Sequence, residues 1–150
     1  MARDPYEMST IIERMSALNT LTEARDFGTG EKYFTVEIHI MSYIANHPGI
    51  TVTKLARDWN RTKGAISQIV KKLETKELIY RVRGKGAVKG VCLYVTEKGK
   101  RLDCAHREYD NKTYADFYTK FEEYYSAEKV QELFGMLEKW IELIAEDKKD

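Results

Sequence analysis

The segment Lys63–Leu73, KGAISQIVKKL, carries side chains that can bind a polyanion on one face of a predicted helix. Its apolar residues recur at helical spacing, which indicates one buried stripe. These residues are Ile66, Ile69, Val70 and Leu73. The opposite face combines hydrogen-bond donors, a small residue and cations: Lys63, Gly64, Ser67, Gln68, Lys71 and Lys72. A helix with this face can enter the major groove of double-stranded DNA, with polar groups toward base edges and lysines mainly toward phosphates.

A preceding helix must hold this segment in place. Either Thr51 or Thr53 can cap that helix, which runs to about Asn60 with three side chains turned inward, Leu55, Ala56 and Trp59. Arg61 and Thr62 then turn the chain, and Thr62 can cap the next helix. Two helices separated by a turn of about three residues form a helix-turn-helix pattern.

A hairpin is predicted directly after the second of these helices. Residues 78–83 and Val91–Val95 are rich in β-favouring side chains, and the loop between them holds three glycines and two lysines. A hairpin with such a tip can follow the DNA backbone into the minor groove, where cations gain from the negative potential. The predicted DNA-contacting residues are Thr62, Lys63, Gly64, Ser67, Gln68, Lys71, Arg83, Lys85 and Lys89.

Charge is divided unevenly along the chain. Residues 51–101 hold 14 Lys and Arg against four acids, a net charge of +10, while the remainder holds 11 against 20. One basic third in a chain of net charge +1 is typical of a surface that binds a polyanion.

Amphipathic helices are predicted on both sides of this basic unit. Residues 6–25 and a last helix capped by Ser126 carry apolar stripes at helical spacing. Thr35 can cap a helix over Val36–Asn46, and a long aromatic-rich helix starts at Glu97. The outer stripes need a partner surface, which a second copy of the chain supplies with two-fold symmetry. The residues expected at this dimer interface are Ile11, Met15, Leu133, Leu137, Trp140, Ile141 and Ile144.

These elements predict a mainly α fold with a small β-hairpin wing (α+β), a winged helix-turn-helix with flanking N- and C-terminal dimerisation helices. The length of 150 residues suits a single domain. Within it, we expect residues 30–100 to form the DNA-binding lobe, and residues 1–29 and 101–150 to form the helical dimerisation lobe.

Several other classes of protein are not indicated. No run approaches the ~18 apolar residues of a membrane span, and the N-terminus has no apolar run suited to a secretory signal, so we expect a cytoplasmic protein without a membrane partner. Two cysteines are too few for a disulfide framework. No serine, histidine and acid, nor any carboxylate pair, has a spacing that suggests an assembled catalytic site. We therefore expect neither an enzyme nor a cofactor.

The chain resembles the MarR (multiple antibiotic resistance regulator) family of bacterial transcription regulators. The resemblance rests on residues 35–56, 63–81 and 91–102 and on outer helices of the expected length. It implies a homodimer on a palindromic operator, with a recognition helix in each major groove and wings on the flanking minor grooves. It also implies a repressor that a small ligand releases from DNA.

By the same resemblance, a small aromatic or phenolic ligand would bind where the dimer helices meet the DNA-binding lobe. His39, Tyr43 and Tyr109 are the candidates for such a pocket, with core packing as the competing explanation. Zinc-responsive members of the family carry histidines on the second and fifth helices, where His39 and His106 also lie.

Neither a metal site nor a redox site is predicted, although both stay open as alternatives. The histidines and Cys104 lack a compact ligand spacing. Peroxide sensors of the family typically keep their reactive cysteine on the first helix, which holds neither Cys92 nor Cys104.

Two positions depart from the family pattern. Family members often carry Asp-x-Arg in the wing, where this sequence has Ala87-Val88-Lys89, so that Lys89 supplies a cation but no bidentate fork. The position after the recognition helix is often Gly and here is Glu77, for which a left-handed backbone would be unfavourable. The two departures bear on the geometry and affinity of the wing. The missing wing Arg also leaves open a winged-helix module that binds protein partners and lacks specific DNA binding.

Overall fold

The computed structural model describes residues 5–20, 23–84 and 90–147 of the chain. The elements in chain order are α1 (Pro5–Thr20), β1 (Arg25–Asp26), β2 (Lys32–Tyr33), α2 (Thr35–Asn46), β3 (Ile50–Thr51), α3 (Val52–Asp58), α4 (Lys63–Thr75), β4 (Ile79–Arg83), β5 (Val91–Val95), α5 (Glu97–Glu122) and α6 (Ala127–Asp147). Within the described residues, no helix is long and apolar enough to cross a membrane.

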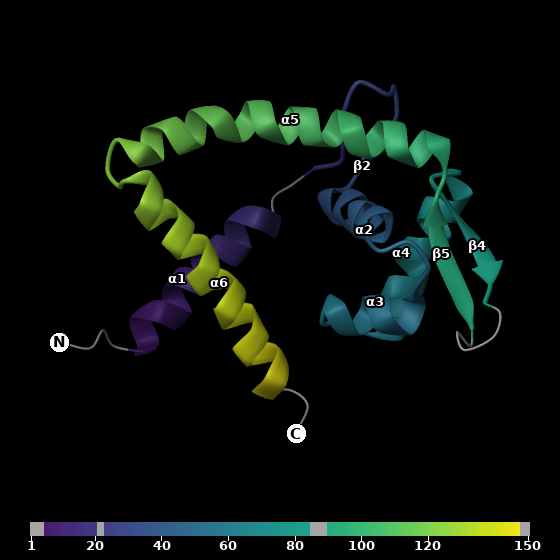
Figure 1. Cartoon of the computed structure of the whole chain (residues 1–150), viewed down its shortest axis with the longest axis horizontal. Coiled ribbons are helices and arrows are strands. Elements are labelled where there is room, and N and C mark those ends of the chain that lie inside the picture. The colour runs from purple at the N-terminus through teal and green to yellow at the C-terminus, as the bar shows by residue number, and fades with distance from the viewer. Residues whose placement is uncertain (1–4, 21–22, 85–89, 148–150) are drawn as a thin grey trace.

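The elements form two groups that the long helix α5 connects (Figure 1). One group contains α2, α3, α4 and the hairpin of β4 and β5, and the other contains α1 and α6. The mainly helical fold with a small antiparallel wing is therefore confirmed.

Helix α2 lies at the centre of the first group and supplies much of its core. Its fully buried apolar side chains are Ile38, Ile40, Met41 and Ile44. The prediction that Thr35 caps α2 is wrong, because the N-cap is Phe34. The Phe34 backbone N–H donates to the Glu37 carboxylate at 3.4 Å. This bond satisfies the backbone donor of the N-cap residue, so that the helix begins at Thr35.

Helix α3 ends at Asp58, slightly before the predicted end at Asn60. Asn60 has a left-handed φ of 48°, and the Arg61 and Asn60 N–H groups donate to the carbonyl oxygens of Ala56 and Arg57 at 2.9 and 3.0 Å. This is the Schellman pattern, in which Asn is tolerated at the left-handed position. The turn between α3 and α4 is thereby fixed.

The wing belongs to a three-stranded antiparallel sheet with strand order β3-β5-β4. Leu93 at its centre pairs with Ile50 on one side and Arg81 on the other, and it is fully buried. The short strand β3 also starts α3, since the Thr51 hydroxyl, not that of Thr53, accepts from the Lys54 N–H at 3.2 Å. The predicted hairpin is confirmed, with β4 starting at Ile79.

The first helix is shorter than the predicted range of 6–25, because its last predicted residue, Arg25, pairs in β1 with Tyr33 of β2. The Asp26 carboxylate accepts hydrogen bonds from the backbone N–H groups of Thr29 at 2.8 Å and Gly30 at 3.1 Å. This local turn closes a hairpin and competes with helix.

Helix α5 starts at Glu97, as predicted, and ends at Glu122. Tyr124 and Tyr125 lie in the turn after Glu122 rather than in the helix. The Ser126 hydroxyl accepts from the Lys129 N–H at 3.5 Å, so the predicted cap of α6 is confirmed.

Candidate nucleic-acid interface

Helix α4 presents a polar face along its length. The helix packs against the core through three fully buried side chains, Ile66, Val70 and Leu73. The residues at the spacing i, i+3, i+4, i+7 and i+11 on the other side are all exposed, namely Gly64, Ser67, Gln68, Lys71 and Thr75. A straight row at this spacing is the surface that a helix offers to a groove.

The start of α4 is fixed by its cap. The Thr62 hydroxyl accepts a hydrogen bond from the Ala65 N–H at 3.1 Å, as predicted. Gly64, in the first turn, is exposed, and a Cβ at this position would meet only the Thr62 hydroxyl oxygen, at 4.0 Å. The fold itself therefore does not require a glycine there, and the space in front of the helix start is open.

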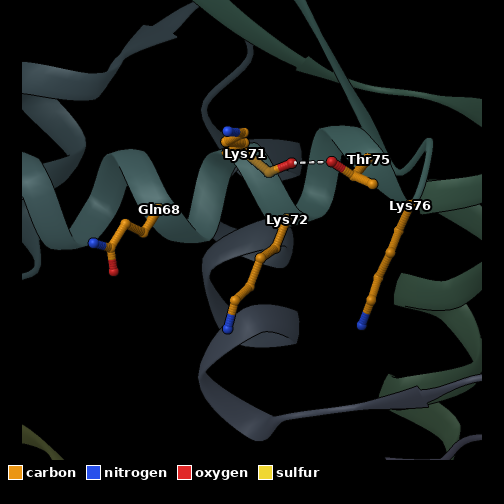
Figure 2. Close-up of a pocket in the computed structure, with 5 residues that line it drawn as sticks. All are labelled: Gln68, Lys71, Lys72, Thr75 and Lys76. Atoms are coloured by element: carbon orange, nitrogen blue, oxygen red, sulfur yellow. Dashed lines mark hydrogen bonds between the residues drawn. The ribbon is translucent and has the colours of Figure 1, made fainter.

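The lysines of this region fall into two groups. The ammonium groups of Lys63 and Lys71 make no ion pair with any acid in the part of the chain that the structure describes. Lys72 and Lys76 instead reach the Glu37 carboxylate, at 3.6 and 3.3 Å. Figure 2 shows Lys72 and Lys76 extending side by side from one flank of the helix, with Lys71 on the other.

On the wing, Arg83 lies at the end of β4 and is exposed. The Gly84 N–H donates to the Gly90 carbonyl oxygen at 2.8 Å, which brings the two ends of the loop together. Lys85 and Lys89, predicted to contact DNA, lie outside the described residues.

A second candidate site lies between α2 and α5. It is a shallow, open pocket of about 390 Å³ lined by His39 and Tyr43, among other residues. The Tyr43 ring stacks on His47, with 4.1 Å between ring centroids. Tyr109 lies outside this lining, since its ring packs edge-on against Phe27 at 5.2 Å. Of the three predicted pocket residues, His39 and Tyr43 therefore line this pocket and Tyr109 does not.

Three possible metal ligands meet in the same pocket. One ligand atom each from His39, His106 and Asp110 can be chosen so that all lie within 4.8 Å of one another. His106 is 4% exposed, and its Nε2 lies 3.4 Å from the Asp110 carboxylate. Burial lowers the pKa of His106 below its ordinary value of 6.5, against the opposing effect of Asp110. The neutral imidazole that this favours is the form that binds metals.

The predicted interface residues on the outer helices are all exposed in the single chain. Ile11 and Met15 on α1 are 43% and 51% exposed, and Ile141 on α6 is 67% exposed. The remaining members on α6 are Leu133, Leu137, Trp140 and Ile144, each about two-fifths exposed. Apolar surface of this extent is unusual in a monomer and marks a surface that another molecule covers.

Comparisons with known proteins agree with this geometry. Residues 35–86, from α2 through the first residues of the wing loop, match the model of the MarR family. Over this segment, which includes the helix-turn-helix, the chain is similar to the MarR family. It is 29% identical over 99 residues to the "Uncharacterized HTH-type transcriptional regulator YhjH" of Bacillus subtilis strain 168. This alignment spans 66% of the chain but only 57% of the relative's length.

The similarity in fold to solved structures extends over nearly the whole chain. The transcriptional regulator SlyA has a TM-score of 0.72 to it at 20% identity, with 97% of this chain and 96% of the SlyA chain covered. A zinc-responsive MarR family member, Lactococcus lactis ZitR, has a TM-score of 0.61 at 18% identity, covering 93% and 97% of the two chains. ZitR has also been solved in complex with DNA.

Two residues were missed by the sequence reasoning, Asp110 and Glu37. Asp110 follows His106 by four residues, a helical spacing that could have indicated a shared face. Glu37 stands among the apolar residues of α2, and an acid on an apolar face indicates a buried ion pair. Its partners on α4 could not be read from local spacing, because they lie more than thirty residues away in the chain.

Proposed function

We propose that this chain is a transcriptional regulator that binds double-stranded DNA as a homodimer in the cytoplasm. The observation that carries the proposal is the exposed face of α4, on which Lys71 lies beside Ser67 and Gln68. A related fold, ZitR, has been solved on DNA, which supports the same use here.

The proposed contacts divide by chemistry. Ser67 and Gln68 can donate to base edges, so they would carry the sequence discrimination. The cations would contact phosphates without regard to sequence, with Thr62 and Gly64 letting the backbone approach closely. These cations are Lys63, Lys71, Arg83, Lys85 and Lys89.

Salt titrations test the proposal. The double variant Lys63→Ala/Lys71→Ala should flatten the plot of log binding constant against log salt by about 1.8, since each lost phosphate contact contributes about 0.9. Duplex DNA from upstream of the chain's own gene and a random duplex are titrated by fluorescence anisotropy. The charge-matched control, Lys112→Ala/Lys120→Ala on the exposed surface of α5, should leave the slope unchanged. Equal slopes in wild type and the α4 variant would contradict the proposal.

We also propose how the protein regulates transcription. We infer a repressor that dimerises through α1 and α6 and recognises a palindromic operator. A small aromatic ligand in the pocket of His39 and Tyr43 would lower its DNA affinity. Ligands that raise the melting temperature of the free protein should also release operator DNA. A winged-helix module that binds protein partners would show only salt-sensitive, non-specific DNA retention.

A second candidate function is a cation-responsive regulator. The meeting of His39, His106 and Asp110 favours it, since two imidazoles and a carboxylate form a ligand set suited to zinc. Zn²⁺ should then raise the melting temperature of wild type but not of Asp110→Asn. Asp103→Asn, an acid on the same helix that binds Arg107 at 2.9 Å, is the control and should keep the zinc response. Equal zinc responses in wild type and Asp110→Asn would exclude the site.

A further inference from the structure

Glu37 is a buried acid placed between α2 and the recognition helix α4. Its side chain is 3% exposed, and it is the only buried carboxylate in the described part of the chain. Its charge is compensated by the Lys76 ammonium group at 3.3 Å, the Lys72 ammonium group at 3.6 Å, and the Phe34 backbone N–H at 3.4 Å. A carboxylate this well enclosed holds its partners firmly, because an unpaired buried charge is very unfavourable.

The two lysines are also held by the aromatic residues that precede α2. The Lys76 ammonium lies 4.5 Å from the Tyr33 ring centroid and donates to the Lys32 carbonyl oxygen at 3.3 Å. The Lys72 ammonium lies 6.0 Å from the Phe34 ring centroid. Cations over ring faces at these distances are attracted to them. Both lysines are therefore turned toward α2.

Glu37 pairs with some of the lysines at α4 and not with others. At about 100° per residue, Lys72 lies on the flank of α4, and Lys76, the C-cap residue, follows one turn later on the same side. Lys71 lies in the middle of the exposed face. Figure 2 shows the separation, with Lys72 and Lys76 extending in parallel away from Lys71. The Lys72 side chain is nevertheless 61% exposed. It can therefore turn toward solvent when the negative charge of Glu37 is removed.

We propose that Glu37 is a specificity-determining residue that sets how many cations α4 presents to DNA. It keeps Lys72 and Lys76 on α2 and leaves Lys71 and Lys63 for phosphates. This inference rests on the proposed DNA-binding function. A released lysine would gain phosphate contacts that do not depend on sequence. Glu37 therefore lowers non-specific affinity and leaves discrimination to the polar residues on the face.

The test is the salt dependence of binding to a random-sequence duplex. Glu37→Gln keeps the shape of the side chain and an oxygen for the Phe34 N–H, but removes the charge. The slope of log binding constant against log salt should steepen by about 0.9 for each lysine that gains a phosphate. Glu97→Gln is the matched control, since it makes the same change in net charge and releases Lys100, paired at 2.6 Å, at the start of α5.

A triple variant separates released lysines from a loosened fold. Glu37→Gln/Lys72→Gln/Lys76→Gln should return the slope to that of wild type, because the released cations are gone. An unchanged slope in Glu37→Gln, an equal change in Glu97→Gln, or a triple variant as steep as Glu37→Gln would each overturn the inference. Wild type that fails to bind the duplex at any salt concentration would instead contradict the proposed function, and the inference with it.

Discussion

The Thr96 hydroxyl donates a 2.7 Å hydrogen bond to the carbonyl oxygen of Glu77, and so joins the end of the recognition helix to the start of α5. The same hydroxyl oxygen caps α5 by accepting from the Gly99 N–H at 3.1 Å. The Thr96 N–H also donates to the Leu78 carbonyl oxygen at 2.9 Å. The orientation of α4 is thus tied to the helix that leads to the proposed dimer interface.

Replacing Glu77 with glycine should stabilise the protein. Glu77 has a left-handed φ of 58°, and its N–H and that of Leu78 close a Schellman motif on Glu74 and Leu73. A residue with a Cβ costs about 1 kcal/mol there. Glu77→Gly should raise the free energy of unfolding by about that amount in urea titrations. Gln68→Gly, at an exposed position inside α4, should lower it by about 0.5–1 kcal/mol, and a loss in both variants would contradict the strain.

Gly99 should not tolerate a side chain. A Cβ at this position would collide with the Leu78 carbonyl oxygen and the Val95 side chain. Gly99→Ala should therefore lower the free energy of unfolding by about 1–3 kcal/mol, as overpacking does. Gly135→Ala is the control, since a Cβ there meets nothing within 4 Å and removing a helical glycine should stabilise by about 0.5–1 kcal/mol. Similar effects at both glycines would show that the contact is unimportant.

Local patterns were enough to predict helix α4 and its cap. Ile66, Val70 and Leu73 repeat at helical spacing, and Thr62 is a residue type that caps helices. The end of the first helix was predicted wrongly, because helical spacing continues into a stretch where the Asp26 turn is more favourable.

Contacts between distant segments could not be predicted in the same way. The Glu37–Lys76 bond joins residues 39 apart in the chain, and His39 meets His106 only because α2 crosses α5. Helical periodicity shows which face of each helix is buried, but it does not show which residue on another helix lies opposite. The sequence therefore predicted the exposed polar row on α4, but not the ion pair beside it.

Replacing Gly64 with alanine should change protein stability and DNA affinity in opposite directions. Gly64→Ala adds a methyl group in open space, so the free protein should be more stable by about 0.5–1 kcal/mol. DNA affinity should fall, because the methyl group would occupy the space that the proposed contact with the DNA backbone needs. Urea titrations and anisotropy measure the two effects. Gly135→Ala should give the stability gain without the loss of affinity, and undiminished affinity in Gly64→Ala would place the DNA elsewhere.

Ile141 should control the oligomeric state. The side chain is 67% exposed on α6, so Ile141→Glu should leave the fold of one chain unaffected. A charge buried in a dimer interface is strongly unfavourable, and sedimentation should show dissociation, with at least a tenfold rise in the dimer dissociation constant. Gln131→Glu adds the same charge to the same helix outside the predicted stripe and should remain dimeric. A monomeric wild type would contradict the dimer itself.

Tyr33 should make stability fall at high pH. Burial, together with its 2.9 Å hydrogen bond to Glu31, raises the pKa of Tyr33 from 10.0 to about 12. The unfolded chain therefore loses this proton first, so the stabilisation is complete below pH 10 and is lost as the pH rises toward 12. The loss should reach about 3 kcal/mol for a shift of this size.

Comparison with Tyr33→Phe isolates this contribution from the lysines that titrate over the same range. The variant keeps the ring under the Lys76 ammonium group, so the neighbouring ion pair should persist. Urea titrations on both sides of pH 10 should show a smaller fall in the free energy of unfolding for Tyr33→Phe than for wild type. Tyr124→Phe, at a side chain that is 79% exposed, should fall as wild type does. Parallel falls in wild type and Tyr33→Phe would mean that the Tyr33 hydroxyl is equally ready to ionise in the folded and unfolded chains.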